Sequence, residues 1–183
     1  MEELKVINQE QVNKLYDMFS DLVSVLNKYG IRWCCSGGTL LGAVRNGGLI
    51  PWDDDIDITI DREQVEYLFW LKHYVEIKGR KLVKVGKYIK LKEGNIFIDI
   101  FILDDGKFPQ RHWSSYNFTD DELYPTSTSK FGDIVVNIPH KYKEYLDRTM
   151  PEWDSIAHIY NHYTTSKKKI TLTDELRQPY LPT

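Results

Sequence analysis

The sequence predicts an α+β (mixed α/β) fold in which a small mixed β-sheet is flanked by helices. Three observations carry this prediction: a helical apolar pattern over about residues 8–29, an acidic run leading into a strand at residues 50–60, and an apolar strand at residues 95–104 that one carboxylate interrupts. Strands that alternate with helical segments are typical of a sheet covered by helices.

The N-terminal part is predicted to be an amphipathic helix over about residues 8–29. Its apolar positions at helical spacing are Val12, Leu15, Tyr16, Phe19, Leu22, Val23, Leu26 and Tyr29. Gly30 stands where a glycine ends a helix. We therefore expect this helix to pack its apolar side on the sheet.

The remaining elements follow from local patterns of apolar and turn residues. In the first half they are a strand at residues 31–35, a short helix at about 39–45, the acidic strand up to Ile60, a helix around residues 65–69 and a hairpin about Gly86. In the second half they are a strand at 95–104, a surface loop at 106–130, a strand at 134–138, and two short helices over about 140–163 divided near Pro151. The long loop is a candidate for closing over a ligand.

The acidic run places Asp53, Asp54, Asp55 and Asp57 at the mouth of an otherwise apolar strand. Because strand side chains alternate between faces, Asp55, Asp57 and Thr59 share one side. Two carboxylates at i and i+2 repel each other unless a hard cation lies between them, and Mg²⁺ is the usual cation for oxygen ligands. The run therefore favours a metal site over an acidic turn.

Two further segments add to this site. The Gly37-Gly38 pair lies between a strand and a helix-compatible run, a layout that presents backbone N–H groups to a phosphate, although a Gly-Gly pair alone is more often only a tight turn. Asp99 is the single charge within an apolar strand. Such a carboxylate is costly unless it ligates a metal or pairs with a lysine or arginine.

Length and composition bound the class of protein. The 183 residues, 42% of them hydrophobic, suffice for one core, so we expect a single domain over residues 1–183. A formal net charge of −3 gives no long-range attraction to polyanions, so nucleic acid is not an expected partner. We find neither a membrane-span pattern nor a hydrophobic targeting segment, which predicts a soluble, cytoplasmic protein.

The cysteines and two histidines offer no further site. Cys34 and Cys35 are adjacent on a predicted strand, so their side chains point to opposite faces and we expect no disulfide between them. His158 and His162 have i, i+4 spacing on a predicted helix and could ligate a metal. Since no third ligand lies near them in the sequence, we do not expect a metal there.

Together these segments resemble the nucleotidyltransferase superfamily, whose core combines a Gly-Gly or Gly-Ser turn, an Asp-x-Asp strand and a third carboxylate on a neighbouring strand. The matching residues, in order, are Gly37-Gly38, Asp55-Ile56-Asp57 and Asp99. The run from Gly38 to Asp57 is similar to the hallmark of the LicD family, which includes bacterial phosphorylcholine transferases and the eukaryotic fukutin and fukutin-related proteins. The resemblance covers about residues 31–146 and implies a nucleotidyltransferase-like core.

The resemblance also implies a reaction. It is the transfer of a phospho-substituent, phosphocholine or an alditol phosphate, from a CDP-linked donor such as CDP-choline to a hydroxyl of a glycan or glycolipid acceptor, with release of CMP. One or two Mg²⁺ ions, or Mn²⁺ in their place, are the implied cofactor. The alternative is another nucleotidyltransferase chemistry, which places NMP from an NTP on a small molecule or a protein and uses the same metal site.

We assign Asp55, Asp57 and Asp99 as metal ligands and catalytic residues. Asp99 is also the candidate base for the incoming hydroxyl, because a carboxylate suffices when the metal acidifies that hydroxyl. Asp53 either binds the metal or caps the turn.

The phosphate-binding residues are expected on the glycine turn and at two cationic positions. On the turn they are Ser36, Gly37, Gly38 and Thr39. Arg45 either reaches a phosphate or holds the acidic run by an ion pair. Lys90 either neutralises the leaving phosphate or lies on the surface of the hairpin.

Overall fold

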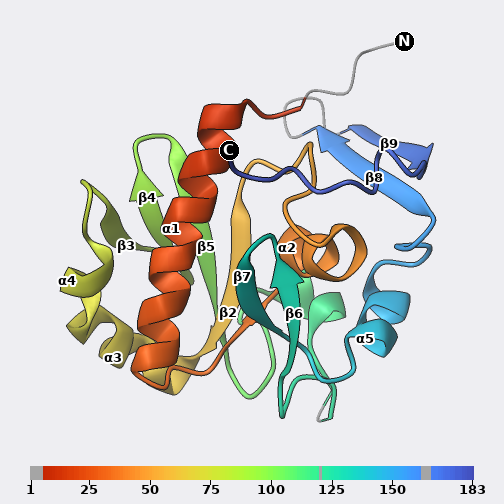
Figure 1. Ribbon diagram of the computed structural model, residues 1–183. Helices are drawn as coiled ribbons and strands as arrows, with labels where there is room; N and C mark the ends of the chain where they lie inside the picture. The colour runs from red at the N-terminus through yellow and green to blue at the C-terminus, as the bar shows by residue number, and fades with distance from the viewer. Residues whose placement is uncertain (1–5, 120, 162–165) are drawn as a thin grey trace.

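The computed structural model describes residues 6–119, 121–161 and 166–183. Its centre is a five-stranded mixed sheet of order β1-β2-β5-β4-β3 with helices packed around it, which confirms the predicted fold class (Figure 1). The strands are β1 (Trp33–Cys35), β2 (Ile56–Asp61), β3 (Lys81–Val85), β4 (Tyr88–Glu93) and β5 (Ile96–Leu103). β2 and β5 are parallel, and the other neighbouring pairs of this sheet are antiparallel.

Helix α1 (Gln9–Lys28) crosses one face of the sheet, where the sequence predicted it (Figure 1). Asn8 caps its N-terminus in a capping box with Gln11, which satisfies backbone N–H groups that the first helical turn leaves free. At the other end Gly30 has a φ of 68°, a backbone conformation that glycine adopts without steric cost. The capping box thus explains where the helix begins, and Gly30 explains why it ends just before β1.

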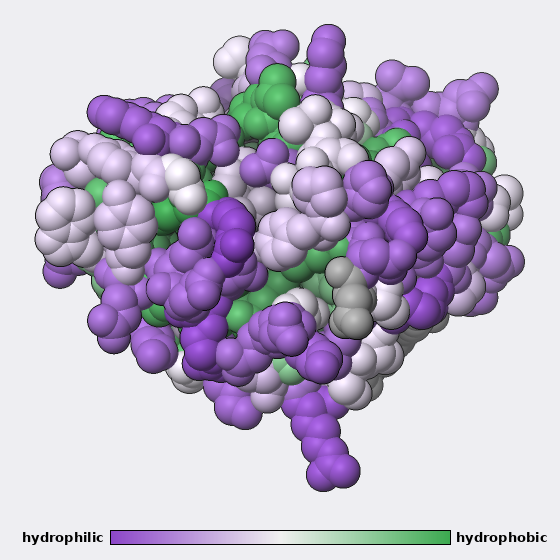
Figure 2. All heavy atoms as spheres, turned by 90° about the horizontal axis from the view of Figure 1, so that it is seen from below, coloured by the Kyte–Doolittle hydropathy of each residue, from purple (hydrophilic) through white to green (hydrophobic). Residues whose placement is uncertain are grey.

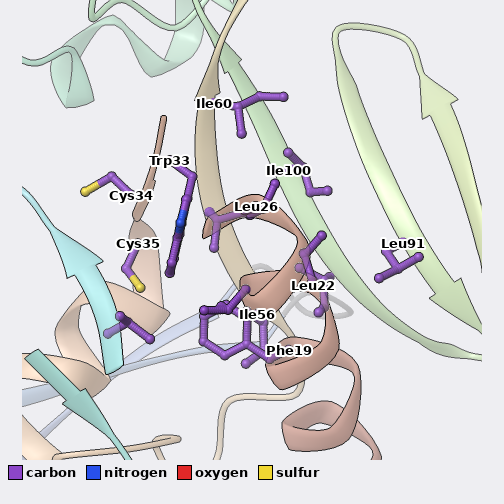
Figure 3. Packing of buried hydrophobic residues seen from close by; sticks show 14 of the residues in the cluster. Phe19, Leu22, Leu26, Trp33, Cys34, Cys35, Ile56, Ile60, Leu91 and Ile100 are labelled. Atoms are coloured by element: carbon purple, nitrogen blue, oxygen red, sulfur yellow. The ribbon is translucent and has the colours of Figure 1, made fainter. Parts of the chain in front are cut away.

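The core lies between α1 and the sheet. Figure 3 shows Phe19, Leu22 and Leu26 of α1 directed at Ile56 of β2 and Ile100 of β5. Because side chains alternate along a strand, placing these isoleucines against α1 turns the intervening residues of β2 and β5 to the opposite face. The carboxylates of both strands therefore lie on the face away from α1.

The two cysteines are free and buried, as predicted. Cys34 is paired in register with Thr59 and Cys35 with Ile58, so the two side chains lie on different faces of the sheet.

The segment after β1 forms α2 (Gly37–Leu41), which continues as a π-helical turn, η1 (Gly42–Asn46). Gly47 then leaves the helix with a φ of 78°. The remaining helices are η2 (Arg62–Gln64), α3 (Val65–Trp70), α4 (Lys72–Val75), η3 (Arg111–Tyr116) and α5 (Tyr142–Thr149). None of the helices in these described ranges combines the length and apolar character that crossing a membrane requires.

Two hairpins lie outside the central sheet: β6 (Ser127–Phe131) with β7 (Ile134–Ile138), and β8 (Ile156–Asn161) with β9 (Ser166–Thr171). The prediction of one continuous surface loop at residues 106–130 was therefore wrong, because the segment contains both η3 and β6. Its aromatic side chains explain the difference: Trp113 of η3 packs against Phe101 of β5, with ring centroids 4.9 Å apart. Burying these rings orders a segment whose composition is otherwise that of a loop.

The second of the two predicted C-terminal helices was also wrong. α5 ends at Thr149, close to Pro151, and the chain then enters strand β8 in place of a helix. The β-branched residues Ile156 and Ile159 favour a strand that pairs with β9. His158 therefore lies on a strand, and His162 lies outside the described residues.

Candidate functional site

Three charged residues form a row across three neighbouring strands. Asp57 of β2 is paired in register with Asp99 of β5, and Asp99 is paired with Lys90 of β4. Residues in register on neighbouring strands project from the same face, so their side chains meet. The sheet thereby brings together two carboxylates that are 42 positions apart in the sequence, 99 minus 57.

Asp55 completes a cluster with these two aspartates. Asp55, Asp57 and Asp99 each offer a carboxylate oxygen, and the three atoms lie within 4.8 Å of one another. Asp53, Asp54 and Asp55 form a second such group. Carboxylate oxygens are the ligands that Mg²⁺ and similar hard cations prefer, so the donor set fits a divalent cation.

The electrostatics of the cluster also fit a cation. Burial raises the pKa of Asp57 well above its ordinary value, and the neighbouring charges of Asp55, Asp53 and Asp99 raise it further. Burial, followed by the charges of Asp55 and Asp54, raises the pKa of Asp53 to about 8. Carboxylates crowded in this way are stabilised in their ionised form when a cation lies among them.

The glycine pair is required by the close approach of these carboxylates. A methyl group at Gly37 would overlap Oδ2 of Asp57, and one at Gly38 would overlap Oδ2 of Asp53. Gly37 also has a φ of 51°, which disfavours side chains with a Cβ atom. The turn and the carboxylate cluster are therefore in direct contact, as the order of motifs along the sequence predicted.

The two hydroxyl residues beside the glycines differ in their contacts. Ser36 is buried, and its Oγ has no hydrogen-bond partner among the described residues. The Oγ of Thr39 accepts a hydrogen bond of 2.8 Å from the backbone N–H of Asp57. Ser36 is thus the hydroxyl left for a ligand, whereas Thr39 helps to position Asp57 on β2.

Arg45 lies near the end of η1 and is half-buried. Its Nε donates to Oδ1 of Asn46 (2.9 Å) and its Nη1 donates to the carbonyl of Trp153 (3.1 Å). Burial, and then the charge of Arg177, lowers the pKa of Arg45 to about 10, while Asp53 acts in the opposite direction. Arg45 thus links the end of η1 to the segment after α5.

Lys90 is not on the surface of the hairpin, because only 17% of its side chain is exposed. Its Nζ lies 2.9 Å from Oδ1 of Asp99 and 3.4 Å from the centroid of the Phe97 ring. Burial raises the pKa of Asp99, whereas the hydrogen bond and charge of Lys90 lower it. Asp99 is thus paired with a lysine and also lies in the carboxylate cluster.

Sequence reasoning missed the aromatic side of the site. A cavity of about 270 Å³ adjoins Ser36, Gly37 and Asp57. Its other walls come from β5, η3, α5 and the loops beside them. The signal available in the sequence was the group of aromatic residues Phe108, Trp113 and Tyr116 inside the segment predicted to be a loop.

A larger cavity, of about 670 Å³, lies at the carboxyl ends of β2 and β5, away from the carboxylate cluster. Figure 2 views the molecule from this end and shows hydrophobic side chains at the bottom of a hollow framed by hydrophilic ones. The charged groups here pair with each other: Arg32 with Asp61 at 2.9 Å, and Arg62 with Asp104. The cluster beside the glycine turn is therefore the better candidate for chemistry.

Comparisons with known proteins agree with this geometry. The solved structure of the antibiotic-resistance factor ANT(2'')-Ia matches with a TM-score of 0.52 over 76% of both chains, at 15% sequence identity. This likeness concerns the fold alone, which is the α+β nucleotidyltransferase-like fold.

The chain belongs to the LicD/FKTN/FKRP nucleotidyltransferase-domain family, whose model matches residues 30–141. An uncharacterised protein of Rickettsia typhi is 34% identical over 96% of this chain and 61% of its own length, so the chain spans about three fifths of that relative. Ribitol 5-phosphate transferase FKRP of Homo sapiens is 28% identical over 69% of this chain and 29% of its own. Lipopolysaccharide cholinephosphotransferase LicD of Haemophilus influenzae is 44% identical over 24% of this chain and 16% of its own.

Proposed function

We propose that this chain is a Mg²⁺-dependent transferase that moves a phospho-substituent from a CDP-linked donor to a glycan hydroxyl and releases CMP. The observation that carries the proposal is the convergence of Asp55, Asp57 and Asp99 beside the glycine turn. The names of two relatives support it, since FKRP is a ribitol 5-phosphate transferase and LicD a lipopolysaccharide cholinephosphotransferase.

In this proposal Asp55, Asp57 and Asp99 would hold one or two Mg²⁺ ions, with Asp53 as a further ligand. A bound cation of this kind neutralises charge on diphosphate oxygens and acidifies an attacking hydroxyl. The protein supplies few of the six oxygens that Mg²⁺ requires, so the donor's diphosphate supplies others. Metal and donor should therefore strengthen each other's binding by the same factor.

The chain's own groups bind the donor and move the proton. The backbone N–H of Gly37 and the free hydroxyl of Ser36 hold the diphosphate, whereas the backbone N–H of Gly38 already donates a hydrogen bond to Asp57. Asp99 accepts the proton of the glycan hydroxyl on a carboxylate oxygen. Lys90, beside Asp99, neutralises the negative charge that develops on the departing CMP.

The test is a ligand panel read by thermal stability and by CMP release. CDP-choline, CDP-ribitol, CDP-glycerol and the four NTPs are each added with Mg²⁺ and with a chelator. We expect at least one CDP-linked compound to stabilise the protein with Mg²⁺, by about 2.7 kcal/mol at 100 times its dissociation constant, and only weakly with chelator. Equal stabilisation in both conditions would refute the proposal. Stabilisation by NTPs instead would support the alternative, transfer of NMP.

A further inference from the structure

The acidic loop (residues 47–55) joins η1 to β2 and carries Asp53, Asp54 and Asp55. All of its residues are described, and it lies outside the helices and strands of the fold. Like charges at short range repel one another until a cation lies among them, so a loose loop would let these carboxylates move apart. The shape that the loop needs for metal binding therefore depends on contacts with other parts of the chain.

Leu49 holds this loop through both polar groups of its backbone. Its N–H donates a 3.0 Å hydrogen bond to the hydroxyl oxygen of Tyr16, on α1. Its carbonyl accepts a 2.8 Å hydrogen bond from the N–H of Tyr180, with which Leu49 forms an antiparallel bridge. Leu49 is 1% exposed, so water does not replace these bonds readily. Two distant segments of the chain therefore meet at a residue just ahead of the carboxylates.

Tyr16 also fits tightly between two glycines. A Cβ atom at Gly48 would lie 2.5 Å from its hydroxyl oxygen, and one at Gly132 would lie 2.8 Å from Cε1 of its ring. Gly132, in the turn between β6 and β7, donates a 2.7 Å hydrogen bond from its N–H to the carbonyl of Gly47. The start of the acidic loop is thus enclosed by α1 and by the β6–β7 turn.

The C-terminal segment (residues 173–183) runs from the end of η1 to α1. Figure 1 shows its end beside the N-terminal half of α1. The carbonyl of Leu176 accepts a 3.1 Å hydrogen bond from Nδ2 of Asn46, the last residue of η1. At the other end, the N–H of Thr183 donates a 3.0 Å hydrogen bond to Oδ1 of Asn13, on α1. The segment therefore fastens the acidic loop to the helix that packs on the sheet.

We propose that Tyr16 and the C-terminal segment position the acidic loop for metal binding, by holding its carboxylates where they can share one cation. This inference rests on the proposed function, because it requires the carboxylate cluster to bind a divalent cation. The apparent dissociation constant of a ligand is its intrinsic value divided by the fraction of protein in the binding shape. Contacts that keep the loop in that shape therefore tighten metal binding without touching the metal.

The coupling between the segment and the metal is mutual. If docking of the C-terminal segment tightens the binding of a cation, the cation must favour docking of the segment by the same factor. A contact that only stabilises the fold has no such effect. The inference therefore predicts a change at residues 173–183 when a cation binds at the carboxylate cluster.

The first experiment measures binding of Mn²⁺, without nucleotide, by electron paramagnetic resonance. Tyr16→Phe removes the acceptor of the Leu49 N–H but keeps the ring, which packs 5.3 Å from Phe131 between centroids. We expect it to bind Mn²⁺ about tenfold or more weakly, because the loop is in the binding shape for a smaller fraction of the time. Tyr124→Phe is the matched control, because its hydroxyl donates to Asp61 at the opposite end of β2. An equal loss in both variants would overturn the inference.

The second experiment isolates the bond between Tyr180 and Leu49. Tyr180→Pro lacks the N–H that donates to the Leu49 carbonyl, whereas Tyr180→Ala keeps this N–H and loses only the ring. We expect Tyr180→Pro to bind Mn²⁺ at least about fivefold more weakly than Tyr180→Ala. Circular dichroism and melting temperature check the fold of both variants.

The third experiment tests the mutual effect in the unaltered protein. Amide hydrogen exchange is followed with Mg²⁺ and with a chelator, and peptides from residues 173–183 are compared with peptides from the β3–β4 hairpin. We expect Mg²⁺ to slow exchange in the C-terminal segment by about tenfold and to leave the hairpin unchanged. Exchange in the segment that does not respond to Mg²⁺ would overturn the inference.

These results also separate this inference from the proposed function. Mn²⁺ affinity of Tyr16→Phe within about twofold of the unaltered protein, or equal affinities of Tyr180→Pro and Tyr180→Ala, would overturn the inference while the proposed function stands. Weakened Mn²⁺ binding in Tyr16→Phe and Tyr180→Pro, in a protein that no CDP-linked donor stabilises, would support the inference and refute the proposed function. An unaltered protein that binds no Mn²⁺ would overturn both.

Discussion

Lys90 and Asp99 face each other across β4 and β5, with Nζ of the lysine 2.9 Å from Oδ1 of the aspartate. Only 17% of the Lys90 side chain and 13% of the Asp99 side chain are exposed, so the pair is shielded from solvent. Burial raises the pKa of Asp99, and the lysine opposes this shift by favouring the ionised carboxylate. It thereby keeps Asp99 able to bind a metal or to accept a proton.

Lys90→Met should shift the pH dependence of transfer. Removing the ammonium raises the pKa of Asp99, so the acid side of the pH–rate profile should move upward by about one pH unit or more. The rate at neutral pH should fall accordingly. Lys84→Met, on the exposed side of neighbouring β3, is the control. If the acid side of the pH–rate profile lies at the same pH in Lys90→Met and in the unaltered protein, the Lys90–Asp99 pair does not govern the proton transfer.

Asp55→Asn and Asp57→Asn should each abolish transfer without unfolding the protein, because the change removes a charge but conserves volume. Loss of an electrostatic contribution of several kcal/mol at a metal-assisted centre corresponds to about 10³-fold or more in rate. CMP release measures the rate, and circular dichroism checks the fold. Asp104→Asn, at an exposed ion pair with Arg62, is the matched control. Activity within tenfold of the unaltered protein in both variants would exclude these two metal ligands.

Gly38→Ala should damage ligand binding more than stability. The new methyl group would overlap the Asp53 carboxylate, which must then move away from the cluster. We expect Mg²⁺-dependent binding of the CDP-linked donor to weaken about tenfold or more, with a small change in melting temperature.

Gly86→Ala is the control for this substitution. A Cβ at Gly86 has open space around it, but the φ of 60° disfavours alanine, so this variant should lose stability and keep donor affinity. If both glycine variants lose stability and donor affinity in the same proportion, contact with Asp53 is not the reason why position 38 requires glycine.

The metal-free protein should become less stable as pH rises from about 4 to about 8. The folded protein holds a proton on Asp53, whose pKa is raised to about 8, while the unfolded chain releases it near pH 4. The stability due to this proton is complete below pH 4 and is lost as pH approaches 8, at no more than ~1.4 kcal/mol per pH unit.

Urea unfolding at pH 5, 6.5 and 8 in the presence of a chelator measures this loss of stability. Asp53→Asn cannot titrate at that position, so its stability should fall less steeply with pH. Mg²⁺ should also reduce the slope in the unaltered protein, because it stabilises the ionised carboxylates. If the free energy of unfolding changes equally with pH in Asp53→Asn and in the unaltered protein, the pKa of Asp53 is not raised to about 8.

Much of the fold and the carboxylate cluster could be predicted from local sequence. The apolar period of residues 9–28 and the glycine after it specify α1. The alternation of Asp55, Asp57 and Thr59 with isoleucines specifies which side of β2 is polar. The motif order also anticipated contact between the glycine turn and the acidic strand.

Three features required the tertiary structure. The pairing of Lys90 with Asp99 depends on the register of β4 against β5, and strand register is a non-local property. The order of residues 111–116 depends on Phe101, a partner on β5 that the local pattern does not reveal. Strand β8 stands where a helix was predicted because it pairs with β9, and this pairing adds to the strand propensity of Ile156 and Ile159.

The sequence by itself thus determined the chemistry of the site, because the type and spacing of the carboxylates and glycines are local properties. Only the tertiary structure decided which groups surround that chemistry. The aromatic cavity draws Phe101 from β5, Trp113 from η3 and Tyr145 from α5, three elements that the sheet and its covering helices bring to one place. Contacts between distant segments form only when the whole core packs, so no local pattern could specify them.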